Sequence, residues 1–195
     1  MLVLQYFSNE TENYWKFGGR CIAKNNAGFD LFDKFVDMDF ERIKEMLQLN
    51  MNTLTLLSYC FGKEMAKKGD GTIINVGSTA SFQPLPHMSA YSASKAFVVS
   101  FSEALHKEMK PYGVNVLCVC PGTTKTAFLK EVGLEKDNDK RLISKIAHMV
   151  AMKPEDVARI VWEAYQKNKS FSIPGKLNNI QYSLLGLKIP TESFI

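Results

Sequence analysis

The stretch TIINV, residues 72–76, decides the fold, because it is a nearly continuous run of apolar, mostly β-branched residues. Such a run is typical of a strand buried on both faces in a parallel sheet. It lies between two long segments with apolar residues at helical spacing, residues 39–67 and 89–110, and Asp39 is placed to cap the first of them. A helix, a buried strand and a second helix in succession indicate a layered α/β fold.

Outward from this unit the same alternation continues. A short strand is expected at residues 21–23, another buried strand at 114–119, a helix from Pro154 to about residue 167, and a last short strand at 170–173. Strands that alternate with helices predict a parallel sheet covered on both faces, which is the doubly wound, Rossmann-like α/β class.

Length and composition fit one globular domain. The chain has 195 residues, of which 46% are hydrophobic and 23% charged. We expect a single domain at residues 21–175, flanked by an atypical segment 1–20 and a tail 176–195. The net charge of +4 comes from scattered residues, which predicts no nucleic-acid partner. No stretch reaches the ~18 apolar residues of a membrane span, so we expect no transmembrane segment and a cytoplasmic location.

The four cysteines are Cys21, Cys60, Cys118 and Cys120. None forms a CxxC pair, so no metal site is expected. Buried free thiols are their ordinary interpretation, and they favour a reducing compartment. We expect Cys118 and Cys120 to point to opposite faces of the strand that contains them.

The strongest chemical signal is YSASK, residues 91–95. Tyr91 and Lys95 are four residues apart at the start of a helix, so they share a face. A free phenol titrates near pH ~10, and a neighbouring ammonium lowers that pKa, which makes the phenol a usable general acid/base. Taken alone, such a pair is more often ordinary surface packing, so its meaning depends on what surrounds it.

The surroundings bring polar residues to the ends of three successive strands. Ser78 follows the strand 72–76, NNAG at residues 25–28 leaves the preceding strand, and PGTTKT at residues 121–126 leaves the next one. Doubly wound folds bind their ligands at the carboxyl ends of parallel strands. Ser78 is therefore placed to hydrogen-bond a substrate oxygen beside Tyr91. The alternative is a strand-end serine that satisfies backbone groups.

With these motifs in this order, and with Asn50 between them, the chain resembles the short-chain dehydrogenase/reductase family over about residues 21–175. The resemblance implies a Rossmann-like fold and NAD(P)-dependent hydride transfer between a carbonyl and an alcohol. The catalytic residues that it implies are Asn50, Ser78, Tyr91 and Lys95. The cofactor-binding residues that it implies are Asn25, Ala27, Gly28, Tyr91, Lys95, Pro121, Gly122, Thr124 and Thr126.

The resemblance also implies a role for each catalytic position. Tyr91 would be the acid/base, and Lys95 would lower its pKa and hold the nicotinamide ribose. Ser78 would orient the substrate carbonyl. Asn50 would hold a water in a proton relay to Lys95, the alternative being a helix-interior residue that faces solvent. Asn25 would lie against the adenosine ribose.

The implied cofactor is NADP or NAD, with NADP favoured. Pro121, Gly122 and Thr124 would contact the nicotinamide amide, and Thr126 would lie at the same end of the cofactor. The residues that select between the two cofactors belong to a part of the family pattern that this sequence lacks.

The pattern breaks upstream of Asn25. In the family, a strand and a glycine-rich TGxxxGxG loop that binds the pyrophosphate come before the NNAG element. Here Gly18-Gly19 lacks that pattern, and Lys24 stands where a central strand would carry an apolar residue. We therefore expect an N-terminally truncated sheet with an unprotected edge, and residues 1–4 as a candidate substitute strand. A truncated or mis-spliced product, an incomplete gene prediction and a half-domain kept for association are the three explanations.

Two functions follow. The first is an NAD(P)-dependent oxidoreductase that acts on a small carbonyl or alcohol, with Tyr91 as acid/base. The second is an inactive truncated fragment that cannot bind cofactor and associates through its two long helices, which form the homodimer interface in the family. A hydrolase built on Ser78 is a weaker third hypothesis, because the sequence has no GxSxG motif.

The substrate pocket is expected to be apolar, although apolar loop residues are often ordinary packing. The residues that suggest it are Phe82, Leu85, Met88, Phe128 and Leu129. His87 lies in the same loop, and we expect it to be exposed, the alternative being a place in the pocket lining. The tail LLGL at residues 184–187 is a candidate for contact with a membrane surface.

Overall fold

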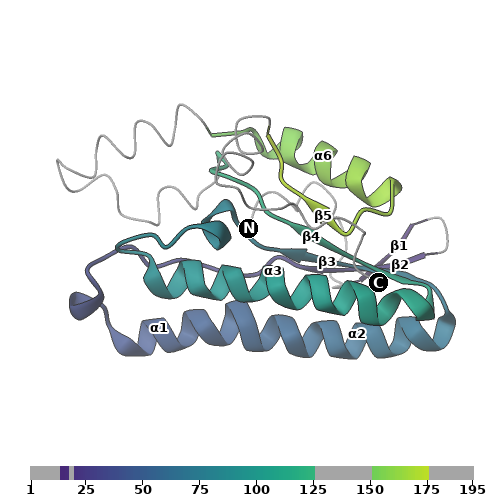
Figure 1. Ribbon diagram of the computed structural model, residues 1–195, viewed down its shortest axis with the longest axis horizontal. Coiled ribbons are helices and arrows are strands. Elements are labelled where there is room, and N and C mark those ends of the chain that lie inside the picture. The colour runs from purple at the N-terminus through teal and green to yellow at the C-terminus, as the bar shows by residue number, and fades with distance from the viewer. Residues whose placement is uncertain (1–13, 18–19, 126–150, 176–195) are drawn as a thin grey trace.

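The computed structural model describes residues 14–17, 20–125 and 151–175, and they form one layered α/β unit (Figure 1). Its sheet has five strands in the order β1-β2-β3-β4-β5, and β2 to β5 are parallel. The strands are β1 (Tyr14–Phe17), β2 (Arg20–Asn25), β3 (Gly71–Val76), β4 (Val114–Val119) and β5 (Phe171–Ser172).

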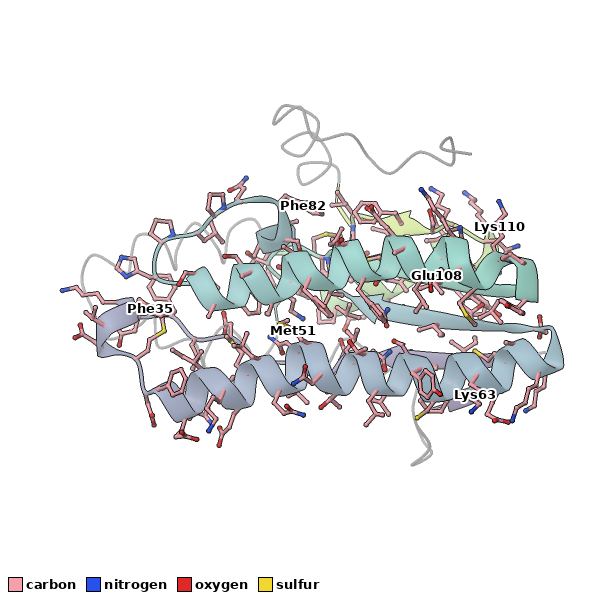
Figure 2. All side chains as sticks on the ribbon, turned by 60° about the horizontal axis from the view of Figure 1, so that its bottom comes forward. Phe35, Met51, Lys63, Phe82, Glu108 and Lys110 are labelled. Atoms are coloured by element: carbon pink, nitrogen blue, oxygen red, sulfur yellow. The ribbon has the colours of Figure 1, made fainter. Side chains whose placement is uncertain are left out.

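Helices cover both faces of this sheet. One face carries α1 (Phe40–Leu47), a π-helical segment (Gln48–Thr53), α2 (Leu54–Lys68) and α3 (Ser89–Met109). The other face carries α6 (Pro154–Gln166), as Figure 1 shows. Phe35 lies at the end of the α1–α2–α3 layer where α1 begins, and Lys110 lies at the opposite end (Figure 2). This arrangement confirms the doubly wound fold. In the part of the chain that the structure describes, no helix has the length and hydropathy of a membrane span.

The core divides according to the alternation of side chains along the strands. Ile73 and Val116 pack toward α2 and α3, together with Met65 of α2. Ile74 and Leu117, the next residues in each strand, pack against α6 on the other face. A buried strand with apolar residues on both faces is the reason for the continuous apolar runs in the sequence.

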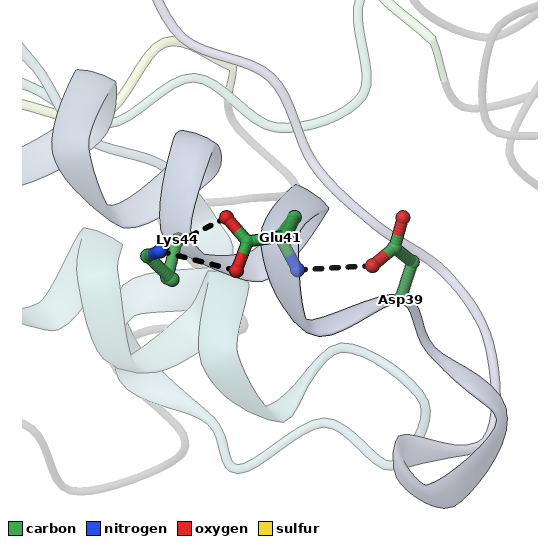
Figure 3. A network of polar contacts seen from close by, with 3 residues as sticks. All are labelled: Asp39, Glu41 and Lys44. Carbon is green, nitrogen blue, oxygen red and sulfur yellow. Dashed lines mark hydrogen bonds and ion pairs between the residues drawn. The ribbon is translucent and has the colours of Figure 1, made fainter.

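The helical layer begins at Asp39, the predicted N-cap. Its carboxylate accepts a hydrogen bond from the Glu41 amide at 3.0 Å (Figure 3). The Lys44 ammonium lies 2.9 Å from the Glu41 carboxylate one turn later. The cap satisfies one of the amides that a helix start leaves unpaired.

The expectation that β2 is an unprotected edge is wrong. β1 pairs antiparallel with β2, and Tyr14 lies opposite Ala23. An antiparallel neighbour needs only a short connection, whereas a parallel one needs a long crossover, so the chain immediately before β2 can cover its edge. Lys24 of β2 is half-buried, and burial lowers its pKa. Residues 1–4, the candidate substitute strand, lie outside the described residues.

The expectation that Cys118 and Cys120 face opposite sides is also wrong. Residues two apart in an extended chain share a face. Both thiols are buried on the α2–α3 side, and their Sγ atoms are 3.9 Å apart. All four cysteines are free, as predicted, but only Cys118 and Cys120 are buried; Cys21 is half-buried and Cys60 is exposed.

Candidate active site

The carboxyl ends of β2, β3 and β4 meet at one edge of the sheet. Asn25 lies opposite Asn75, and Val76 lies opposite Val119, so the turns after these strands are neighbours. The Thr79 amide donates to the Pro121 carbonyl at 3.0 Å and joins two of the turns. The three motifs that the sequence placed after strands are therefore brought together.

Tyr91 and Lys95 lie in the first two turns of α3 and point into this edge. Both are buried, with 6% and 7% of their surfaces exposed. The Lys95 ammonium donates to the Val76 carbonyl at 3.0 Å. It also lies 5.8 Å from the centre of the Tyr91 ring. Burial on this scale is unusual for a lysine and a tyrosine and separates the pair from ordinary surface packing.

Burial dominates the titration of both groups. It raises the pKa of the Tyr91 phenol, and the nearby Asp30 carboxylate adds to the rise, while a side-chain hydrogen bond with Ser78 opposes it. Burial also lowers the pKa of Lys95 to about 8. Desolvation of the phenolate is the largest cause of the raised pKa of Tyr91, and the role of Lys95 in lowering that pKa stays a prediction.

Ser78 is held by the 3-10 turn that follows β3. Its hydroxyl accepts a hydrogen bond from the Ala80 amide at 3.1 Å, and its own amide donates to the Ser81 hydroxyl at 3.3 Å. Ser78 therefore does satisfy backbone groups, as the alternative interpretation holds. The same contacts fix its hydroxyl beside Tyr91, with which it hydrogen-bonds.

Asn50 lies in the π-helical segment between α1 and α2 and is 1% exposed. The interpretation as a solvent-facing residue is therefore wrong. Its amide nitrogen donates to the Phe29 carbonyl at 3.1 Å and to the Ser94 hydroxyl at 3.2 Å. Short π-helical segments inside α-helices are frequent at functional sites.

The amide oxygen of Asn50 is aimed at the space around Gly28. It is buried and has no hydrogen-bond partner among the described residues. A Cβ atom at Gly28 would lie 2.7 Å from this oxygen and 3.4 Å from the Lys95 ammonium nitrogen. Only a residue without a side chain fits between these two groups at this separation, so Gly28 is what allows the NNAG turn to approach them.

Asn25 is buried at the carboxyl end of β2. Its side-chain nitrogen donates to Ser58 of α2 at 2.9 Å and to the Asn75 oxygen at 2.8 Å. The Asn75 nitrogen in turn donates to Ser102 of α3 at 3.0 Å. We call these four residues the inner network. It ties two strand ends to two helices below the site. The side-chain oxygen of Asn25 is buried and has no hydrogen-bond partner among the described residues, and its contact with the cofactor stays a prediction.

The remaining predicted residues lie around the edge. Ala27 is exposed, and Pro121, Gly122 and Thr124 are partly buried in the turn after β4. The Thr124 hydroxyl donates to the Gly122 carbonyl at 3.1 Å. Thr126, with Phe128, Leu129 and the tail segment 184–187, lies outside the described residues.

Side chains of the loop between Ser78 and Tyr91 pack against other parts of the fold. Phe82 packs edge-on against Phe171 at 6.1 Å. His87 is exposed, as expected, and it stacks on Phe32 at 5.5 Å. The Nδ1 atom of His106, in α3, lies 3.1 Å from the Val116 carbonyl, at the far end of the helix from Ser78.

Sequence reasoning missed the serines that complete these contacts. Ser94 joins Asn50 to the Tyr91 carbonyl, to which its hydroxyl donates at 2.7 Å. Ser58 and Ser102 close the inner network. Their signal was present, because each is a small polar residue at a position of a helix that is otherwise suited to a buried apolar residue.

Comparisons with known proteins agree with this geometry. The chain matches the short chain dehydrogenase family over residues 18–137. It is 30% identical over 145 residues to human "Dehydrogenase/reductase SDR family member 4", covering 74% of this chain and 52% of that protein. It is 31% identical over 137 residues to an uncharacterized oxidoreductase of Thermotoga maritima, covering 70% of this chain and 55% of that protein.

Solved structures give the same result. A short-chain dehydrogenase from Sphingobium yanoikuyae, in complex with NADPH, superimposes with a TM-score of 0.70 and 26% identity, over 89% of this chain and 67% of that one. A putative NAD(P)-dependent gluconate 5-dehydrogenase from Beutenbergia cavernae, with bound NADP, superimposes with a TM-score of 0.66 and 28% identity, over 78% of this chain and 63% of that one.

The fold and the site define an α/β protein of the oxidoreductase type, and the chain belongs to the short-chain dehydrogenase/reductase family. It spans about half the length of the curated relatives that it matches.

Proposed function

We propose that the protein is an NAD(P)-dependent oxidoreductase that interconverts a carbonyl and an alcohol, with Tyr91 as the acid/base. The observation that carries the proposal is the burial of Tyr91 and Lys95 together, beside Ser78, at the carboxyl edge of a parallel sheet.

The residues act on the oxygen of the substrate. The bound nicotinamide supplies or accepts the hydride at the carbonyl carbon. Tyr91 gives its phenolic proton to the oxygen that becomes the hydroxyl, and Ser78 hydrogen-bonds the same oxygen. Because burial raises the pKa of Tyr91, its phenol is protonated at neutral pH, which is the form needed for carbonyl reduction.

Lys95 and Asn50 support the transfer of that proton. Lys95 holds a positive charge beside the Tyr91 ring and stabilises the phenolate that forms when the proton leaves. The unpartnered amide oxygen of Asn50 faces Gly28 beside Lys95, where it would accept a hydrogen bond from a water in a relay. This role deepens the one that the resemblance implies.

The residues at the edge fit the nicotinamide and ribose end of the cofactor. Gly28 leaves the Lys95 ammonium accessible from the NNAG turn, and Pro121, Gly122 and Thr124 border the same edge. NADP is favoured over NAD, and two similar solved structures contain NADPH or NADP. The substrate proposed is a small, apolar carbonyl or alcohol, for which Leu85 and Met88 are the described lining candidates. A cytoplasmic location stays a prediction, supported by the four free cysteines.

We further propose that the protein is a homodimer that pairs through α2 and α3. Leu56 and Tyr59 on the outer side of α2 are 60% and 64% exposed, which is unusual for large apolar side chains on one face. A Leu56→Glu variant should elute as a monomer in size exclusion with light scattering if the parent is a dimer. A parent that is itself a monomer would contradict this proposal.

The first experiment is a titration of the purified protein with NADPH and NADH, followed by nicotinamide fluorescence, beside a Tyr91→Phe variant. We expect saturable binding in the micromolar range for both proteins. We expect carbonyl reduction to fall by about 10²–10⁴-fold in the variant, which is the usual contribution of a general acid.

Two results would decide against the proposal. No binding at millimolar cofactor would favour the alternative of an inactive fragment whose catalytic residues are idle. Binding with full activity in Tyr91→Phe would remove Tyr91 from the mechanism.

A further inference from the structure

Ser94 is the fourth residue of the segment YSASK in α3, and none of its surface is exposed. The proposed reaction uses Tyr91 and Lys95 of this segment but gives Ser94 no role. The Ser94 hydroxyl donates to the Tyr91 carbonyl at 2.7 Å and accepts a hydrogen bond from the Asn50 amide nitrogen at 3.2 Å. It therefore joins the helix that carries the acid/base to the residue proposed for the proton relay.

The direction of these hydrogen bonds is fixed. A hydroxyl has one hydrogen to donate. Ser94 gives this hydrogen to the Tyr91 carbonyl, three residues earlier in the helix, so it can only accept from Asn50. The Phe29 carbonyl, 3.1 Å from the same Asn50 nitrogen, is also only an acceptor. Both neighbours on this side of the Asn50 amide therefore require its nitrogen.

The opposite orientation of the Asn50 amide is unfavourable at both ends. Its oxygen would face the Phe29 carbonyl and the Ser94 hydroxyl oxygen, neither of which has a hydrogen to give it. Its nitrogen, a donor, would face the space beside Gly28, which the Lys95 ammonium, another donor, also borders. The buried Asn50 oxygen, which has no partner among the described residues, is thus directed toward that space by the groups behind it.

We propose that Ser94 is a positioning residue, which holds the Asn50 amide in the orientation in which its oxygen accepts a hydrogen bond from the relay water. This inference rests on the proposed function, because a relay matters only if Tyr91 exchanges a proton with the substrate. Of the two acceptors that hold the Asn50 nitrogen, the Phe29 carbonyl belongs to the backbone. Ser94 is the one that a substitution removes.

Ser92 offers a matched control in the same helix. It is 6% exposed, and its hydroxyl donates to the carbonyls of Met88 and Ser89 at 3.0 and 3.1 Å. Among the described residues these carbonyls are its only side-chain partners. Ser92→Ala and Ser94→Ala therefore remove the same atom from buried positions of one helix, and only the second change removes a contact with Asn50.

The test is steady-state carbonyl reduction by the parent, Ser92→Ala and Ser94→Ala in H2O and in D2O. We expect kcat to fall by about tenfold in Ser94→Ala with unchanged KM values, and to stay within about twofold of the parent in Ser92→Ala. The solvent isotope effect on kcat should increase in Ser94→Ala, because reprotonation of Tyr91 through a disordered relay becomes slow. A merely structural loss lowers the amount of active enzyme and leaves the isotope effect unchanged.

Two further variants test whether Ser94 acts through Asn50. Ser94→Thr keeps the hydroxyl and should restore both kcat and the isotope effect. In an Asn50→Ala background, Ser94→Ala should have no further effect on kcat, because no amide is left to position. A further loss of similar size in that background would overturn the proposal. If circular dichroism shows that Ser94→Ala is unfolded, Ser94→Cys replaces it, since a thiol is close in size but a weak acceptor.

The orientation is also measurable without activity. The side-chain amide protons of Asn50, assigned in NMR spectra by their absence from Asn50→Ala, should exchange at least about tenfold faster in Ser94→Ala than in the parent or Ser92→Ala. If the parent has no reductase activity, the proposed function fails, and the exchange rates still decide whether Ser94 holds Asn50. Equal exchange in all three proteins, or a lower kcat with an unchanged isotope effect, would overturn the positioning role.

Discussion

Three tyrosines in the chain are followed four residues later by a lysine, and in two of these pairs both residues lie within one helix with nearly the same geometry. Tyr91 and Lys95 lie in α3, and Tyr59 and Lys63 lie in α2. In each pair the ammonium nitrogen is 5.8 Å from the centre of the ring. The pairs differ in burial, because Tyr91 is 6% exposed and Tyr59 is 64% exposed.

The comparison teaches that the YxxxK spacing alone does not make a site. Tyr91 is desolvated and hydrogen-bonded to Ser78, and Lys95 contacts the end of β3. Tyr59 and Lys63 point to solvent from the outer side of the layer, where charges are screened. The two pairs have the same helical spacing, and what makes Tyr91 and Lys95 candidate catalytic groups is their burial at the edge of the sheet.

The largest expected effect distinguishes the two lysines. Lys95→Met should lower carbonyl reduction by about 10²-fold or more, because the phenolate loses the positive charge that lies beside its ring in a buried site. Lys63→Met, the matched control, should leave the rate unchanged within about twofold. The measurement is steady-state kinetics on both variants. Equal losses in the two variants would mean that the pairs do not differ in function.

The second expected effect is a pH dependence of stability that belongs to Lys95. Its pKa is lowered from 10.5 to about 8 in the folded chain, so the unfolded chain binds more protons between these values. Below pH 8 Lys95 is charged in both the folded and the unfolded chain, so the folded chain carries the full free-energy cost of burying that charge. As the pH rises toward 10.5 the penalty is lost, so stability rises, by on the order of 3 kcal/mol over the window.

This rise is measured as the difference between the parent and Lys95→Met in urea unfolding at several pH values. The raised pKa of Tyr91 has the opposite effect, because only the unfolded chain loses that proton above pH ~10. Taking the difference between two proteins that both contain Tyr91 removes most of this contribution. A constant difference across the window would contradict the assignment to Lys95.

The burial of one pair and the exposure of the other could be predicted only in part from the sequence. The apolar runs at 72–76 and 114–119 indicated buried parallel strands. From them the sequence predicted that Ser78 and Tyr91 lie close together at the carboxyl edge of the sheet. Side chains two residues apart in a strand share a face, so the sequence was sufficient to place Cys118 and Cys120 together. The prediction that they face opposite sides misapplied this rule.

Other features depend on contacts that no local pattern contains. The π-helical segment around Asn50 interrupts α1 and α2 without a change of hydrophobic period, so the sequence read as one continuous helix. The residues of β1 include three aromatic side chains, which suit a strand, but its place in the sheet depends on its antiparallel pairing with β2. The role of Asn25 depends on Ser58 and Asn75, which lie 33 and 50 residues away in the sequence.

The third expected effect tests what holds the buried pair in place. Asn75→Ala removes the partner of both Asn25 and Ser102 and leaves buried polar groups unpaired. We expect a loss of about 2 kcal/mol in the free energy of unfolding. Asn52→Ala is the matched control, because Asn52 is exposed and its side chain donates, within the described part of the chain, to Gln48 of the same helical segment. Similar losses in the two variants would mean that the inner network does not stabilise the fold.

The smallest expected effect belongs to the exposed pair and completes the comparison. In the Leu56→Glu variant, which we expect to be a monomer, a double-mutant cycle with Tyr59→Leu and Lys63→Met should give a coupling of about 0.5 kcal/mol or less, because an exposed cation–π contact is weakened by water. Chemical denaturation at low salt and at 1 M salt measures it, and the coupling should shrink as salt increases. A coupling that is several times larger and insensitive to salt in the parent, but not in Leu56→Glu, would mean that this pair is desolvated in the parent. A second copy of the chain packed on α2 would then shield Tyr59 and Lys63 from water. Both tyrosine–lysine pairs would be buried, and they would differ in what covers them, the sheet edge for Tyr91 and Lys95 and a second chain for Tyr59 and Lys63.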